Sequence, residues 1–249
     1  LLGYSVGAGI DEDKARLNVG YPGRRSDDFP RQAELLVTRL KKYPEQSVKE
    51  GWKLINMFIG TNDIGLLCND GVGISAADYK KYIKEAINII QSHVPRTIIS
   101  IIGIRKLVFD NRARMFRFSR TVRKCVKDFD EIAQKRIEDY RKALAELATD
   151  PDLVRADSAV VSQRVWDDLY HPLTKKDGSY LVDYYDPGIF HISKYGNSLV
   201  AKQLWRQLIR PVGRKRTTND QLADDGSGLE CPDKACPYIR TPANSIDCS

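Results

Sequence analysis

The distribution of hydrophobic and polar residues along the chain predicts helices that alternate with strands. Apolar residues recur at the helical spacing in three segments, 32–42, 76–94 and 193–209. Three short apolar runs are typical of buried strands: 54–59, 97–104 and 159–162. The highly charged segment 112–148 is expected to be mostly helical, with a break in its first half. Alternating strands and helices predict an α/β fold, with helices on both faces of a parallel sheet.

The composition changes after Pro211. Residues 1–210 carry the pattern of one α/β domain, whereas residues 211–249 are polar and rich in Gly, Asp and Pro. We predict a disulfide element rather than a zinc site at Cys231 and Cys236, because no His or second Cys pair stands at ligand spacing. The chain has five cysteines, so one thiol is free or pairs outside the chain. Residues 211–249 are therefore expected to be a tail that is tied down by cysteines or flexible.

Length, composition and charge indicate a globular domain and bear on which partners it can bind. A chain of 249 residues with 42% hydrophobic and 29% charged residues is typical of a globular domain. The net charge of +7 includes basic clusters at 112–127 and 210–216. These clusters indicate either an anionic membrane surface as a partner or solvated faces, and nucleic acid is disfavoured because no binding module accompanies them. No apolar run reaches the roughly 18 residues of a membrane span, and no signal peptide is visible.

A polar loop follows the first predicted strand. Residues 58–63 read Phe-Ile-Gly-Thr-Asn-Asp, and parallel sheets collect their reactive groups at the carboxyl ends of strands. An amide such as that of Asn62 can donate two hydrogens to a developing oxyanion. Asn62 and Asp63 are equally typical of a cap at the start of a helix. The loop gains significance from a second motif downstream, residues 186–196, which reads Asp-Pro-Gly-Ile-Phe-His-Ile-Ser-Lys-Tyr-Gly.

Together, the two motifs resemble those of the GDSL or SGNH hydrolase family, and most closely its phospholipase B branch. The resemblance extends along nearly the whole chain and includes the tail. Further segments that are similar to this branch are 3–9, 17–23, 28–36, 52–57, 68–70, 204–205, 211–215, 231–232 and 240–241. The resemblance implies a three-layer α/β/α sandwich with a flavodoxin-like strand order, 2-1-3-4-5.

The family's nucleophile is absent from the chain. It is a Ser in a Gly-Asp-Ser motif at the end of the first strand, and no Gly-Asp-Ser occurs in these 249 residues. That strand would be central, and inner strands without it would leave backbone groups unpaired, at about 1–3 kcal/mol for each one buried. We therefore expect a companion polypeptide or an N-terminal segment to insert between the strand at 54–59 and its neighbour, and to bring the Ser.

The resemblance assigns roles to three residues of this chain. His191 matches the general base, which would take the Ser proton and return it to the leaving alkoxide. Asn62 and the backbone N–H of Gly23 match the oxyanion donors. Gly23 also has a structural interpretation as a turn glycine after Pro22, and both interpretations can hold.

The acid that orients His191 departs from the family pattern. An Asp normally stands three residues before the His, and this chain has Gly188 there. Asp186 could reach the imidazole through the Pro187-Gly188 turn, and Asp183 is a weaker candidate. The departure leaves open a catalytically silent member of the family that serves a structural or binding role.

A second serine motif in the chain is an alternative to the absent Gly-Asp-Ser motif. Residues 3–7 read Gly-Tyr-Ser-Val-Gly, the spacing of a nucleophile elbow, but only two residues precede them and no helix pattern follows directly. Ser5 is therefore interpreted as a loop serine. No chemical role is assigned to His93 or His171.

The sequence thus predicts a lipolytic esterase that cleaves acyl esters of phospholipids or related lipids through an acyl-serine intermediate. The resemblance implies neither a metal nor a cofactor, and it implies a secreted or lumenal protein, where disulfides persist. The alternatives are the silent family member and an acetyl-ester or carbohydrate esterase on the same scaffold.

Overall fold

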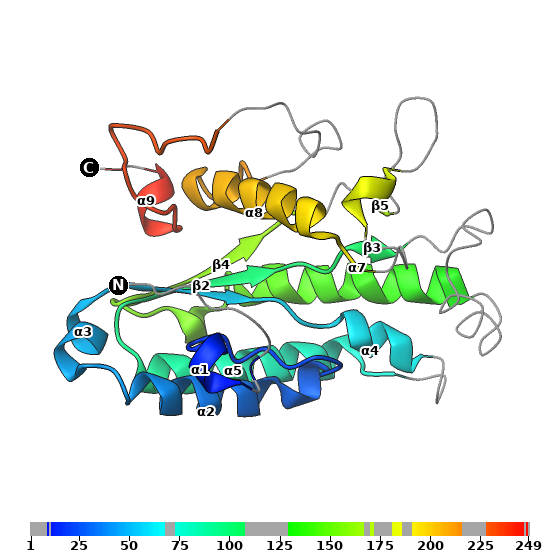
Figure 1. Ribbon diagram of the computed structural model, residues 1–249, viewed down its shortest axis with the longest axis horizontal. Helices are drawn as coiled ribbons and strands as arrows, with labels where there is room; N and C mark the ends of the chain where they lie inside the picture. The colour runs from blue at the N-terminus through cyan, green and yellow to red at the C-terminus, as the bar shows by residue number, and fades with distance from the viewer. Residues whose placement is uncertain are drawn as a thin grey trace.

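The computed structural model describes residues 9, 11–67, 73–107, 129–166, 170–171, 181–185, 191–215, 228–246 and 248. At its centre is a parallel sheet of three strands, β1 (Lys53–Met57), β2 (Thr97–Ile102) and β4 (Ser158–Gln163), in the spatial order β1-β2-β4. This order is that of the last three strands in the expected arrangement. The strands run side by side toward one end of the molecule (Figure 1).

Helices cover both faces of this sheet, which confirms the α/β/α layers. The helices α2 (Phe29–Leu40), α5 (Ala76–His93) and α7 (Phe129–Leu147) bury their apolar stripes in one core with Met57, Ile99 and Val160 of the strands. The helix α8 (Lys194–Ile209) packs on the opposite face, where Trp166, Tyr184 and Leu199 form a second cluster. Figure 1 shows α8 above the sheet and α2 and α5 below it.

The sheet leaves one edge of β1 without a partner among the described residues. β1 pairs directly with β2, from Lys53 opposite Thr97 to Met57 opposite Ile101. The expected additional strand therefore does not insert between β1 and β2. It can pair with β1 only at the outer edge. Leu54 of β1 and Phe58, directly after the strand, are 39% and 48% exposed, so the surface of the strand is also incompletely covered there.

The elements agree with the hydrophobic pattern, although their ends differ. The first two predicted strands end two residues early, because the chain turns after Met57 and Ile102 while the apolar Ile104 remains buried. The third strand, β4, is one residue longer at each end than predicted. The structure adds a short helix α4 (Thr61–Leu66) and a two-stranded parallel sheet of β3 (Lys106–Leu107) and β5 (Tyr170–His171). The remaining short elements are α1 (Glu12–Ala15), α3 (Glu45–Glu50), α9 (Ala243–Ile246), η1 (Ser26–Asp28), η2 (Pro151–Leu153) and η3 (Val182–Tyr184).

The described part of the tail folds back on α8. The Arg240 N–H donates to the carbonyl of Leu208 at 2.7 Å, and the Trp205 indole donates to the carbonyl of Glu230 at 2.6 Å. The disulfide joins Cys236 to Cys248, whose Cα atoms are 5.4 Å apart, and Cys231 is an exposed free thiol. The tail thus contains a disulfide, as expected, and the path of the chain brings Cys248 rather than Cys231 to Cys236.

Candidate functional site

The polar loop after β1 opens the short helix α4. Gly60 precedes the helix with a φ of +122°, which a glycine adopts easily, and a Cβ there would collide with Ile104 and lie 3.0 Å from the Tyr79 ring. No side chain caps the helix. The cap interpretation of Asn62 and Asp63 is therefore wrong, since both lie inside the first turn and use their side chains elsewhere.

Asn62 bonds to the loop that contains Gly23. Its Nδ2 donates to the carbonyl of Arg24 at 2.8 Å. Residues 21–24 form a turn in which the Arg24 N–H donates to the Tyr21 carbonyl at 3.4 Å, with Pro22 second and Gly23 third at a φ of +73°. Pro followed by a residue with positive φ is the signature of a type II turn. The structure thus confirms Gly23 as a turn glycine, and Asn62 bonds to the residue that follows it.

Asp63 bonds to the same loop from a buried position. Its carboxylate is 1% exposed and accepts from the Ser26 N–H at 3.1 Å and from the Ser26 hydroxyl. Burial raises the pKa of Asp63, and the hydrogen bonds from Ser26 oppose that rise. Neighbouring residues of α4 therefore hold the loop at two points, Arg24 and Ser26.

Two stacked tyrosines pack close to this region. The rings of Tyr79 and Tyr140 are parallel, with centroids 3.9 Å apart. The Tyr79 hydroxyl donates to the carbonyl of Ile59 at 3.1 Å, and the Tyr140 hydroxyl donates to the carbonyl of Ile74 at 2.8 Å. Burial raises the pKa of both phenols, and the charge of Asp63 raises it further. Both phenols therefore stay neutral and fix the backbone on either side of α4.

His191 is exposed and lies three residues before α8. The next residue, Ile192, bridges to Tyr185, and Ser193 caps α8 by accepting from the Gly196 N–H at 3.0 Å. The Ser193 hydroxyl also donates to the carbonyl of Asp183 at 2.6 Å. These bonds fix the backbone that carries His191. The start of α8 and the helix α4 lie toward the same end of the sheet, the one to which the strands run (Figure 1).

Several predicted residues lie outside the described part of the chain. They are Asp186 and Gly188 near the histidine, Ser5 of the competing motif, and the basic cluster at 112–127. The acid that orients His191 therefore stays a prediction. Asp183 is described and exposed, and its backbone carbonyl is bound to Ser193.

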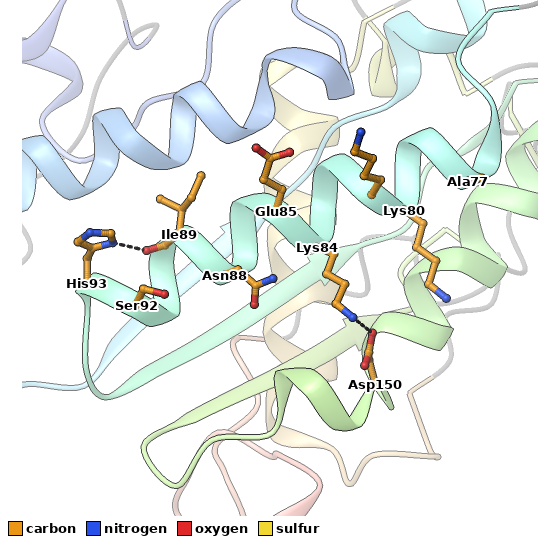
Figure 2. Close-up of a pocket in the computed structure, with 10 residues that line it drawn as sticks. Ala77, Lys80, Lys84, Glu85, Asn88, Ile89, Ser92, His93 and Asp150 are labelled. Carbon is orange, nitrogen blue, oxygen red and sulfur yellow. Dashed lines mark hydrogen bonds and ion pairs between the residues drawn. The ribbon is translucent and has the colours of Figure 1, made fainter.

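A depression of about 740 Å³ lies away from these residues, on the outer face of α5. Figure 2 shows its lysines extending from α5, with Lys84 bound to Asp150 at 2.9 Å. His93 also lines it and bonds through Nδ1 to the carbonyl of Ile89. The surface is open and its cations Lys80 and Lys84 are paired with carboxylates. Asn88 and Ser92 also line it, but no residue of the two motifs does.

Sequence reasoning missed Ser26 and Asp63 as a pair. They are 37 residues apart, and a buried hydrogen bond over that separation leaves no periodic signal. It also missed the contact of Phe58 with Trp166, whose ring centroids lie 6.4 Å apart at the carboxyl ends of β1 and β4.

Among the described residues, no group of three His, Cys, Asp or Glu is arranged to hold a metal ion. No described helix has both the length and the apolarity to span a membrane.

Comparison with known proteins shows similarity to one family along most of the chain. The GDSL-like lipase/acylhydrolase profile matches residues 2–204. The membrane-associated phospholipase B1 of Rattus norvegicus is 31% identical over 98% of this chain and 17% of its own length. The human protein of that name is 31% identical over 99% of this chain and 18% of its own length. The chain thus spans under a fifth of these relatives.

One solved structure, an acetyl esterase mutant with acetate ion, aligns with 73% of this chain and with 65% of its own length. The two are 16% identical in sequence, and the TM-score is 0.44. The family profile covers the turn of Gly23, the loop of Asn62 and the segment of His191. The chain therefore belongs to the GDSL-like lipase/acylhydrolase family.

Proposed function

We propose that this chain forms most of the active site of an esterase that hydrolyses acyl esters of phospholipids or related lipids. The observation that carries the proposal is the 2.8 Å hydrogen bond from Asn62 Nδ2 to the Arg24 carbonyl. It holds the side-chain amide of Asn62 next to the turn that contains Gly23. The amide has a second N–H to offer, and no described residue accepts a hydrogen bond from the Gly23 N–H.

In the proposed reaction, a serine hydroxyl attacks the acyl carbonyl while its proton passes to the imidazole of His191. The carbonyl oxygen becomes an oxyanion, which accepts hydrogen bonds from Asn62 Nδ2 and the Gly23 N–H. Collapse of this intermediate expels the alkoxide of the lipid, which takes the proton from the imidazolium. Water then hydrolyses the acyl-serine by the same steps. The carboxylate of Asp186 would hold the imidazole in the tautomer whose Nε2 can accept a proton.

The serine would come from a companion segment outside these residues. The outer edge of β1 supports this part of the proposal, because its backbone groups have no described partner and Leu54 and Phe58 beside it are exposed. A strand added at this edge would end next to Phe58, close to the loop of Asn62. A catalytically silent role is the alternative, favoured by Gly188 in the place of the usual acid.

The setting of the enzyme is part of the proposal. The relatives are named membrane-associated phospholipases, and a net charge of +7 favours an anionic lipid surface. The Cys236–Cys248 disulfide supports a secreted or lumenal location.

The test is phospholipid ester turnover in the complete natural chain. We expect His191→Ala and Asn62→Ala each to lower turnover by about 100-fold or more, because each removes a group that acts only on the transition state. His93→Ala is the matched control, since His93 lies on the outer face of α5, and it should leave turnover unchanged. A phosphonate that reacts with activated serines should label a residue outside this chain. Full turnover in both variants would refute the proposal, and labelling of Ser5 would favour the elbow motif.

A further inference from the structure

We propose that Asp63 is a positioning residue that sets the distance between the two oxyanion donors, Asn62 Nδ2 and the Gly23 N–H. The inference depends on the proposed function, because it assigns a role within that site. Its basis is the position of the Asp63 carboxylate, which is buried between α4 and residues 24–26 and follows directly after Asn62 in the chain.

Three attachments made by hydrogen bonds determine where the Gly23 N–H lies relative to Asn62. The turn bond from Arg24 to Tyr21 fixes Gly23 within its own loop. The bond from Asn62 to the Arg24 carbonyl attaches that loop to α4 on one side. The bonds from Ser26 to Asp63 attach it on the other side. With only the Asn62 bond, the loop could rotate about a single point, and the second attachment removes that freedom.

The chemistry of the pair explains why a carboxylate occupies this position. Ser26 is fully buried, so both its N–H and its hydroxyl need acceptors inside the protein. A carboxylate supplies two oxygens, and bonds from Ser26 reach both Oδ1 and Oδ2. Asp63 also lies in the first turn of α4, where the exposed N–H groups of the helix favour negative charge. The buried charge is thus satisfied by the loop that it holds.

Oxyanion donors are sensitive to small displacements. A misplacement of about 1 Å can lower a rate by about 100-fold without changing the chemistry of any catalytic group. Loss of the second attachment should therefore weaken stabilisation of the transition state more than binding of the substrate. A role limited to stability would not separate these two quantities.

The experiment compares Asp63→Asn and Ser26→Ala with Ser158→Ala in the complete natural chain. Ser158→Ala removes a buried hydroxyl whose oxygen lies 2.7 Å from that of Thr97, but at the amino ends of the strands, far from α4. For Asp63→Asn and Ser26→Ala we expect kcat to fall by about 10- to 100-fold with KM changed less than about twofold. Affinity for a boronic acid that mimics the tetrahedral intermediate should fall by the same factor. Ser158→Ala should change neither.

The outcomes distinguish a failure of the positioning role from a failure of the proposed function. If His191→Ala and Asn62→Ala abolish turnover while Ser26→Ala and Asp63→Asn keep a normal kcat, the positioning role is wrong and the proposed function stands. If His191→Ala and Asn62→Ala are fully active, both fail. Ser26→Ala keeps the backbone N–H bond to Asp63 and decides the question if Asp63→Asn does not fold.

Discussion

Gly23 occupies the third position of the turn over residues 21–24, with a φ of +73°. A Cβ at this position would touch nothing within 4 Å, so space does not require glycine. The backbone conformation requires glycine, because a residue with a Cβ has a higher energy at positive φ. Gly65 in α4 offers the opposite case, since it also has open space around it but lies in a helix.

We expect Gly23→Ala to destabilise the loop locally by about 1–2 kcal/mol. Gly65→Ala should be neutral or stabilise α4 by up to about 1 kcal/mol, because alanine loses less backbone entropy in a helix. Hydrogen exchange in residues 21–28 measures the first effect and exchange in 61–67 the second. Unchanged protection of 21–28 in Gly23→Ala would show that the turn accepts other residues.

At the scale of elements, the helix α8 and its cap determine where His191 lies. Ser193 accepts from the Gly196 N–H and donates to the carbonyl of Asp183, so one hydroxyl joins the helix to η3. Ser75 caps α5 in the same manner, accepting from the Asp78 N–H at 3.0 Å. The two caps are alike in geometry, but only the first is adjacent to the candidate site.

Ser193→Ala and Ser75→Ala should each cost about 1 kcal/mol of stability. We expect only Ser193→Ala to lower ester turnover, by about tenfold or more, since it releases the backbone next to His191. Hydrogen exchange in the first turn of each helix reports the structural effect, and turnover reports the functional one. Equal turnover in the two variants would mean that the cap does not control the position of the histidine.

The longer regular elements could be predicted from sequence because the helices bury periodic apolar stripes and the strands are short apolar runs. The strand at 97–102 and the helix at 76–93 were found within two residues of their ends for that reason. The pair β3 and β5 could not be found, because two-residue strands contain no period. The partner of Cys236 and the bond between Ser26 and Asp63 depend on the path of the chain, and local sequence carries no signal for either.

At the scale of the whole molecule, the tail attaches to α8 through a buried lysine. Lys215 is 2% exposed and donates to the carbonyl of Gln207. Burial and, to a smaller extent, the nearby charge of Arg240 lower the pKa of Lys215 to about 8. The folded tail therefore binds fewer protons than the detached tail between about pH 8 and the ordinary lysine value of 10.5. Attachment should become stronger as the pH rises through this window.

We expect the attachment of the tail to strengthen by about tenfold from pH 8 to 9.5. The measurement is the rate of proteolytic cleavage within residues 228–246, divided by the rate in Lys215→Met at the same pH. The ratio should fall with rising pH, because the variant has no proton to release. A constant ratio would show that Lys215 titrates alike in both states.

The outer edge of β1, which has no partner among the described residues, also affects how the chain can be handled. An unpaired strand with exposed apolar neighbours such as Leu54 and Phe58 is a template for pairing with other chains, and proteins normally block such edges with charges, bulges or covering segments. When these residues are produced apart from a segment that covers β1, two copies can pair edge to edge and begin to aggregate. A charged residue in place of Leu54 is the simplest protection of this edge.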